Sequence, residues 1–318
     1  MNCEAEADRI TARMVDIVGR DLRRRGVVIA MSGGIDSSVC AALAARAFGA
    51  SKVCGLMLPE HESSHSSLER ATSLAKHLGV AHIVEDITPA LTALGCYRSR
   101  DEAIRAVFPD YGTGWKNKII IAGGKDGSYN YFKLVVQAPE GKLHEARLPL
   151  REYHQIVAAT NYKQRVRKIV EYFHADRLNY AVIGTPNRVE YDQGFFVKNG
   201  DGAADIKPIA HLYKTQVYAM ARHLCLPDEI CSALPTTDTY SLSQGQDEFY
   251  FALPYEKMDV ALWAFNHGVS ERELALFLEL PPAQAAFIYQ DIVAKRRATR
   301  YLHAPPVLVE PVMELWRH

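Results

Sequence analysis

The residues best suited to chemistry form the segment SGGIDSS at positions 32–38. An apolar run at 27–31 precedes it, and an Ala-rich stretch with helical spacing follows it. Two glycines let the backbone turn tightly and approach an anion, while hydroxyl groups and the free N–H groups of a helix start supply donors. The pattern therefore predicts a phosphate-binding turn. Neither a G-x-x-x-x-G-K-[ST] motif nor a G-x-G-x-x-G motif after the strand occurs, which argues against a common P-loop and a dinucleotide dehydrogenase.

The elements that would position this turn follow one another in a regular order. Apolar runs typical of buried parallel strands lie at 27–31, 52–58 and 81–87, and stretches with helical spacing separate them at 35–50 and 68–78. This β-α-β-α-β order indicates an α/β fold with a doubly wound, mostly parallel, Rossmann-like sheet flanked by helices.

The segment at 96–150 breaks that pattern. Runs of β-type residues at 118–122, 130–137 and 142–148 are separated by turn sequences, GGKDGS and APEGK. We expect a small antiparallel β insertion here. It could be a surface excursion that adds stability or an oligomer contact, or it could cover the substrate.

Regular spacing resumes after the insertion. A helix is expected at 155–174, a buried strand at 180–183, a further helix at 215–224 and a helical C-terminal part at 255–300. No internal repeat is visible. We expect one domain spanning 1–318, interrupted by the insertion.

Composition narrows the classes of function. Lys plus Arg and Asp plus Glu each total 37, so no global field favours nucleic acid or a membrane surface. The six cysteines contain no C-x-x-C pair, and their use is typical of the reducing cytoplasm. No apolar run approaches a membrane span and the N-terminus does not resemble a signal peptide. We expect a soluble cytoplasmic protein.

Several segments together resemble a known family. SGGIDSS resembles the pyrophosphate-binding loop of the ATP pyrophosphatase superfamily, whose members cleave ATP between the α and β phosphates. GTPNRVE at 184–190 is similar to the G-T-x-N-x-x-E segment of NAD synthetases, and 194–208 is similar to their G-[YF]-F-T-K-Y-G-D-G-A-x-D-I-x-P signature. HLYKTQV at 211–217 resembles the family's L-Y-K-T-Q-V helix start, and NYKQRVR at 161–167 resembles its N-x-x-A-R-x-R helix.

The resemblance implies an activity and its cofactors. An ammonia-dependent NAD synthetase uses ATP and Mg²⁺ to adenylate deamido-NAD (nicotinic acid adenine dinucleotide), then passes the acyl group to ammonia and releases AMP, pyrophosphate and NAD. By this likeness Lys214, Asp36 and Thr236 are catalytic, and Asp36 and Glu190 hold Mg²⁺. The likeness implies ATP contacts from Ser32, Gly33, Gly34, Asp36, Ser37, Ser38, Met57, Thr185, Lys214 and Thr236. It implies contacts with the acceptor substrate from Asn161, Arg165, Phe195, Lys198, Asp201 and Asp205.

A further segment matches the family in outline. PTTD at 235–238 is similar to the P-[ST]-A-[DE] loop, and the polar QGQDE at 244–248, followed by LPY at 253–255, resembles an acidic lid. Thr236 would bind phosphate, and Gly245 would permit closure over the intermediate.

Departures from the family pattern leave alternatives open. Met57 stands where many small NAD synthetases carry an arginine near adenine, so an adenine contact there is apolar or through the backbone. Pro186 and Asn199 replace more usual residues, and the insertion at 96–150 is longer than in the compact family form. A sister ligase that amidates a different carboxylate therefore remains an alternative. A nucleotide-binding module without catalysis fits less well, because both carboxylates and the lysine of the family are present. A tRNA-thiolating enzyme fits less well, because the chain has no net charge to favour RNA.

The nitrogen donor and the assembly are also expectations. The residues before 27 provide one helix and no glutaminase domain, so free ammonia or a separate glutaminase subunit would supply the nitrogen. The resemblance implies a homodimer.

Overall fold

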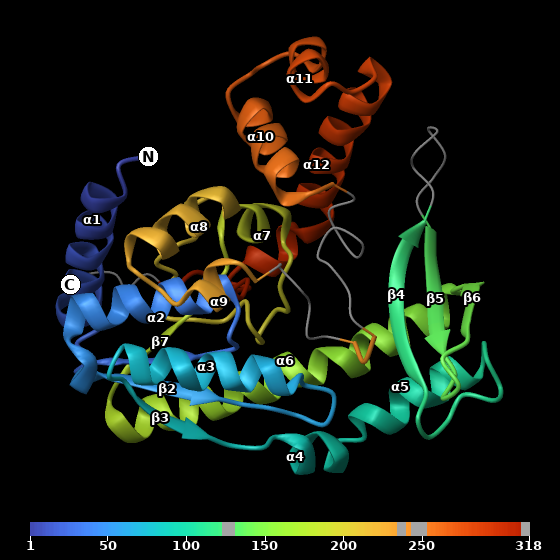
Figure 1. Ribbon diagram of the computed structural model, residues 1–318, viewed down its shortest axis with the longest axis horizontal. Helices are drawn as coiled ribbons and strands as arrows, with labels where there is room; N and C mark the ends of the chain where they lie inside the picture. The colour runs from blue at the N-terminus through green and yellow to red at the C-terminus, as the bar shows by residue number, and fades with distance from the viewer. Residues whose placement is uncertain (123–130, 234–239, 243–252, 313–318) are drawn as a thin grey trace.

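The centre of the molecule is a four-stranded parallel sheet with the order β3-β2-β1-β7 (Figure 1). The computed structural model describes residues 1–122, 131–233, 240–242 and 253–312. The strands are β1 (Val27–Ala30), β2 (Val53–Met57), β3 (Ala81–Val84) and β7 (Ala181–Ile183). In the central register, Val28 lies opposite Cys54 on one side and Val182 on the other. The carboxyl ends of β1, β2 and β7 therefore meet at one edge.

Helices cover both faces of this sheet. One face packs against α1 (Cys3–Asp16), α2 (Ile35–Phe48), α3 (His65–His77) and α8 (Lys214–His223). The other face packs against α4 (Thr88–Ala93) and α6 (Leu150–Leu178). The alanines of α2 are buried because small side chains allow the helix to approach the strands closely. Strands covered on both faces explain the continuous apolar runs, and the predicted doubly wound fold is confirmed. Short elements complete this region: η1 (Ile17–Asp21), η2 (Ala50–Lys52), α7 (Arg188–Gln193) and α9 (Asp228–Cys231).

The segment predicted as a β-rich insertion at 96–150 begins with a helix, α5 (Cys96–Arg105), so the prediction is wrong for this part. The buried side chains of α5, at positions 96, 100, 103 and 104, have helical spacing, which places them on one face against α6. The expected strands are present as β4 (Lys116–Ala122), β5 (Tyr131–Gln137) and β6 (Leu143–Arg147). They form an antiparallel sheet with a core of its own, in which Ile119 and Leu134 pack with Ile156 of α6.

The C-terminal part is helical, as predicted. Helices α10 (Tyr255–Asn266), α11 (Glu271–Leu278) and α12 (Pro282–His303) share a separate apolar core. Figure 1 shows these helices standing above the central sheet, while α6 runs beneath both sheets and connects them.

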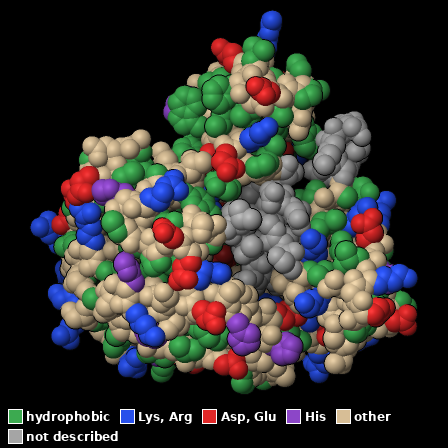
Figure 2. Space-filling model, in the orientation of Figure 1, with side chains coloured by type: hydrophobic (Ala, Val, Ile, Leu, Met, Phe, Trp, Pro, Cys, Tyr) green, Lys and Arg blue, Asp and Glu red, His purple; other side chains and the backbone are tan. Residues whose placement is uncertain are grey.

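Positive and negative side chains are interspersed over much of the visible face of the molecule (Figure 2). Apolar side chains gather over the C-terminal helices, where Trp263, Leu276 and Phe277 are exposed. Within the described ranges, no helix has the length and apolar character needed to cross a membrane.

Candidate active site

The serine-glycine turn joins the end of β1 to the start of α2. Gly33 has a φ of 76°, and a Cβ atom there would collide with the carbonyl oxygen of Ser67, so the position requires glycine. The hydroxyl oxygens of Ser32 and Ser37 lie 3.1 Å apart, and Ser32 Oγ accepts the N–H of Gly34 at 3.3 Å. The turn therefore presents hydroxyl groups at the positive end of a 14-residue helix, which favours binding of an anion.

Ser38 does not reach the cavity beside this turn. Its side chain is buried, and its hydroxyl donates to the carbonyl oxygen of Gly34 at 2.8 Å. A serine in the first turn of a helix can satisfy the carbonyl four residues before it. Ser38 supports the turn from behind, and the ATP contact predicted for it stays a prediction.

A cavity of about 750 Å³ opens at the carboxyl edge of the central sheet. Its lining includes Met57 at the end of β2, Thr185 after β7 and Lys214 at the start of α8. The predicted residues from Ser32 to Ser37 line the same cavity. Residues predicted to bind ATP thus converge from four separate segments, at the place where open parallel sheets bind ligands.

The charged centre of the cavity joins three distant segments. Lys214 forms an ion pair with Asp36, and Asn187 donates from Nδ2 to the other oxygen of Asp36 at 3.1 Å. Asn187 also begins α7, where Glu190 completes a capping box by accepting the N–H of Asn187 at 3.1 Å. An ammonium group and two carboxylates are consequently fixed beside the anion-binding turn.

The protonation state of this centre follows from its charges. Burial of Lys214 alone would lower the pKa of its ammonium group, but the negative charges of Asp36 and Glu190 outweigh burial and raise that pKa above its ordinary value. Lys214 is therefore charged at neutral pH. Burial first, and then the same two carboxylates, raise the pKa of the Cys40 thiol, which stays neutral.

Asp259 of α10 holds the start of α8, which carries Lys214, and sequence reasoning missed this contact. Its two carboxylate oxygens accept the backbone N–H groups of Lys214 at 3.2 Å and Thr215 at 2.7 Å. Burial raises the pKa of the Asp259 carboxyl, and these donors oppose the shift. A carboxylate that accepts the free N–H groups at a helix start usually comes from a residue within one turn of them. Here the two segments are 45 positions apart, so no local pattern could have revealed it.

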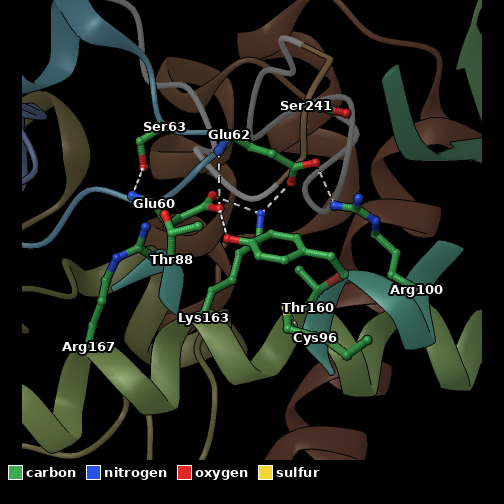
Figure 3. Close-up of polar contacts among 12 residues, drawn as sticks. Glu60, Glu62, Ser63, Thr88, Cys96, Arg100, Thr160, Lys163, Arg167 and Ser241 are labelled. Carbon is green, nitrogen blue, oxygen red and sulfur yellow. Dashed lines mark hydrogen bonds and ion pairs between the residues drawn. The ribbon is translucent and has the colours of Figure 1, made fainter. Parts of the chain in front are cut away.

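Helix α6 forms the floor of the cavity. Asn161 and Arg165, both predicted to contact the acceptor substrate, line it. Lys163, between them in sequence, points the other way into a buried ionic cluster (Figure 3). Its ammonium nitrogen lies 2.9 Å from a carboxylate oxygen of Glu60 and 2.6 Å from one of Glu62. Helix α6, which carries Asn161 and Arg165, is thus tied to the loop that follows β2.

Two side chains from α5 complete this cluster. Arg100 binds Glu62 at 2.6 Å, and the Tyr97 hydroxyl donates to Glu60 at 2.7 Å. Ser63 and Ser64 of the same loop line the cavity. The cluster therefore fixes the distance between the β2 loop and α6, which form two walls of one cavity.

Comparison with known proteins agrees with this geometry. The family model described as NAD synthase matches residues 9–106 and 133–301. The chain belongs to the NAD synthase family. The predicted family is confirmed, and with it the predicted enzyme class, a ligase that forms carbon–nitrogen bonds.

Members of the NAD synthase family match this chain along most of its length. The NH(3)-dependent NAD(+) synthetase of Rhizobium meliloti strain 1021 is 58% identical over 312 residues, which cover 98% of this chain and 93% of the relative. The enzyme of the same name from Thermotoga maritima is 35% identical, covering 78% of this chain and 84% of that one. Family membership makes ATP a substrate of this chain.

Solved structures of similar proteins share the fold. The NMN synthetase of Francisella tularensis aligns with a TM-score of 0.66 and 22% identity, covering 97% of this chain and 98% of that one. The NH3-dependent NAD synthetase of Campylobacter jejuni aligns with a TM-score of 0.64 and 21% identity, covering 98% and 100%.

The NAD synthase signature at 194–208 forms a loop beside the cavity. Phe195, Lys198 and Asp201 line the cavity. Burial raises the pKa of the Asp201 carboxyl, which accepts the N–H of Val197 at 2.7 Å. The Lys198 ammonium donates to the carbonyl oxygens of Tyr301 at 2.7 Å and Ala304 at 3.0 Å, at the carboxyl end of α12. Lys198 therefore joins the signature loop to the C-terminal helix, and the acceptor contact predicted for it stays a prediction.

Asp205, in the same loop, does not line the cavity. Its carboxylate accepts the N–H of Val182 at 2.7 Å and the Tyr172 hydroxyl at 3.3 Å. The loop runs beside β7, with an isolated parallel bridge between Ile183 and Ile206, and Asp205 satisfies an edge donor of that strand. Asp205 therefore supports the scaffold, and the acceptor contact predicted for it stays a prediction.

The remaining predicted loop lies largely outside the described residues. Thr236, Gly245 and the acidic segment 244–248 fall there. Leu253 is described and buried in the core of the C-terminal helices, and Tyr255 begins α10.

Proposed function

We propose that this chain is an ammonia-dependent NAD synthetase, which converts deamido-NAD into NAD with ATP. The central observation is the meeting of Lys214 and Asp36 at the serine-glycine turn, inside a cavity that also presents Asn161 and Arg165. The name and the 58% identity of the Rhizobium meliloti relative support the choice of deamido-NAD and ammonia as substrates. The chain acts as one catalytic unit in this proposal.

The first step is attack of the acceptor carboxylate on the α-phosphorus of ATP. The donors of Ser32 and Ser37, at the positive end of α2, hold the departing pyrophosphate. Lys214 exchanges its contact with Asp36 for the phosphate oxygens, on which negative charge develops. A fixed ammonium group in a partly dehydrated site stabilises that charge more strongly than water does.

The second step forms the amide bond. Ammonia attacks the carbonyl carbon of the acyl-adenylate, AMP leaves with the former carboxylate oxygen, and one proton is released. Adenylation supplies the leaving group, so the protein has to position the reactants and exclude water. No covalent bond to the enzyme is required.

We also propose that Asp36 and Glu190 hold Mg²⁺. Both carboxylates lie near the Lys214 ammonium, and an ionised carboxylate oxygen engaged in one hydrogen bond retains a lone pair for a cation. Among the described residues there is no group of three or more His, Cys, Asp or Glu side chains arranged for a metal. This fits Mg²⁺, which commonly takes one or two carboxylates and completes its shell with phosphate oxygens and water. The ion would neutralise phosphate charge.

The remaining parts of the proposal concern Thr236, the acceptor residues and the setting of the enzyme. Thr236 would contact phosphate, and Asn161, Arg165, Phe195 and Asp201 would contact deamido-NAD. We propose a homodimer, which would cover Ile169 and Phe173, exposed on α6. All six cysteines are free thiols, which supports a cytoplasmic location. Ammonia would enter free or from a separate glutaminase subunit.

A product assay tests this function. Purified protein is mixed with ATP, Mg²⁺, ammonium and deamido-NAD, and AMP and NAD are measured. The proposal expects AMP and NAD in equal amounts, with neither formed when deamido-NAD is left out. Pyrophosphate release with another carboxylic acid, and none with deamido-NAD, would instead support a sister ligase.

A further inference from the structure

One end of the cavity is closed by the antiparallel sheet. Ile121 of β4 and Phe132 of β5 are direct cross-strand partners, so their side chains share a face of that sheet, and both line the cavity. Tyr153 and Val157, one turn apart on α6, line it beside them, and Tyr240 completes the surface. We call these five residues the aromatic wall.

Part of the aromatic wall lies outside the residues that the family model matches. The NAD synthase family model omits residues 107–132, which include β4 and Phe132. The Rhizobium meliloti relative, in contrast, aligns over 98% of this chain. The sheet therefore adds a wall to a cavity whose other residues belong to the family pattern.

The wall presents flat rings that pack against a buried core. The rings of Phe132 and Tyr153 are stacked, with centroids 4.2 Å apart and an angle of 16° between their planes. Ile119 and Leu134 anchor the sheet in its own buried core, and Tyr240 is buried beside the stack. A preformed aromatic surface loses little conformational entropy when a ligand ring packs against it.

The position of the wall indicates which ligand it meets. Tyr153 precedes Arg165 by three helical turns on α6, a distance of about 18 Å along the helix axis. The serine-glycine turn, which holds the phosphates of ATP in the proposed function, lies at the edge of the other sheet. A ligand that contacts both Arg165 and Tyr153 must therefore be long. A dinucleotide has this length and carries a flat ring at each end.

We propose that the aromatic wall is a stacking subsite for a heteroaromatic ring of the acceptor dinucleotide, and that the β4–β6 sheet is a substrate-binding element. No wall residue carries a charge, so this subsite favours a ring over a phosphate group. The inference rests on the proposed function, because deamido-NAD is the dinucleotide in question.

Substitution of Phe132 tests the subsite. Phe132→Leu keeps an apolar side chain and removes the ring, so kcat/KM for deamido-NAD should fall about tenfold, the size of one base–aromatic contact. KM for ATP should stay within about twofold. Tyr153→Leu should cause a similar loss, and Tyr153→Phe, which restores the ring, should recover most of it.

Phe108→Leu is the matched control. Phe108 packs against the same sheet core and near the His144 ring, but it does not line the cavity. It should change thermal stability without changing KM for deamido-NAD. An equal rise in KM for Phe108→Leu would overturn the subsite, as would an unchanged kcat/KM for Phe132→Leu. A rise in KM for ATP alone would assign the wall to the adenine of ATP and also overturn the proposal.

Calorimetric measurement of deamido-NAD binding, without ATP, tests the subsite separately from the proposed function. If Phe132→Leu binds deamido-NAD more weakly than wild type does, the subsite is supported even when no NAD is formed. Absence of NAD formation would refute only the proposed function. Equal binding to both proteins, or no binding to wild type, overturns the subsite.

Discussion

The ammonium group of Lys214 pairs with the carboxylate of Asp36 across 178 positions of the chain. The Lys214 side chain is 3% exposed and that of Asp36 16%, so the two charges meet where water is largely excluded. Charges act more strongly there than at the surface. The pair keeps the ammonium group beside the serine-glycine turn, which in the proposed mechanism reduces the reorganisation needed for catalysis.

Removal of this lysine should abolish most of the activity. Lys214→Met is expected to lower kcat for AMP formation by about 10²–10³, the loss typical for one group that stabilises transition-state charge. The rate is measured at saturating ATP and deamido-NAD, and the thermal unfolding midpoint reports folding separately. The control is Lys52→Met, because Lys52 is exposed and precedes the amino end of β2, away from the cavity at the carboxyl end; it should retain wild-type turnover. More than a tenth of wild-type kcat in Lys214→Met would exclude the proposed role.

Glu190 offers a test of the metal that leaves its helix intact. Glu190→Gln removes the charge, but glutamine can also complete a capping box, so α7 should keep its stability. The Mg²⁺ concentration needed for half-maximal activity should rise about tenfold, because a carboxylate ligand is lost. A titration with Mg²⁺ at constant ATP measures this. An unchanged Mg²⁺ requirement would place the metal away from Glu190.

The buried cluster around Lys163 has a pH-dependent effect on stability. Burial alone would raise the pKa of Glu60, but the charge of Lys163 and the hydrogen bond from Tyr97 outweigh burial and lower it. A carboxyl group with a lowered folded pKa stabilises the fold above its unfolded pKa of about 4.3. That contribution is lost as the pH falls through the folded pKa. Wild-type stability should therefore decline below roughly pH 4.

Lys163→Met should invert this behaviour. At pH 7 the buried carboxylate of Glu60 loses its cation, while Glu62 keeps its pair with Arg100, so the free energy of unfolding should fall by about 3–5 kcal/mol. The deficit should narrow toward pH 5, because the unpaired Glu60 then binds a proton more readily than the unfolded chain does. Urea unfolding at both pH values measures it. Lys133→Met, which breaks an exposed pair with Glu145, should cost less than about 1 kcal/mol. A deficit independent of pH would show that Glu60 does not titrate in the variant.

Substitutions of Asp201 and Asp205 should have different effects, one on substrate binding and the other on stability. Asp205→Ala removes the partner of the Val182 N–H and should lower the free energy of unfolding by about 1–3 kcal/mol, with KM for deamido-NAD within about twofold of wild type. Asp201→Asn, at the cavity wall, should raise that KM. Urea unfolding and steady-state kinetics on both variants decide between the roles. A larger rise in KM for Asp205→Ala would return Asp205 to the acceptor site.

The central sheet and the position of its ligand site could be predicted because their signals are local. Apolar runs such as 27–31 mark strands buried on both faces, and SGGIDSS follows one of them directly. The resemblance of 211–217 to the family's helix start predicts that Lys214 contacts ATP. The ion pair with Asp36 then follows from topology, because the ends of parallel strands converge at one edge.

Other features depend on contacts that sequence spacing does not encode. Asp201 and Asp205 stand in one motif, yet one lines the cavity and the other binds the edge of β7, since the loop turns between them. Lys198 binds the end of α12 more than 100 positions away. Residues 96–105 have helical spacing, but the strand-like runs that follow favour a β assignment for all of 96–150.

Isotope transfer tests the proposed adenylation most directly. Deamido-NAD with heavy oxygen in its nicotinate carboxylate is incubated with the protein, ATP, Mg²⁺ and ammonium, and the products are analysed by mass spectrometry. Attack of the carboxylate on the α-phosphorus predicts one heavy oxygen atom in AMP and one retained in the NAD amide. AMP without heavy oxygen, or heavy oxygen in inorganic phosphate accompanied by ADP, would contradict the account.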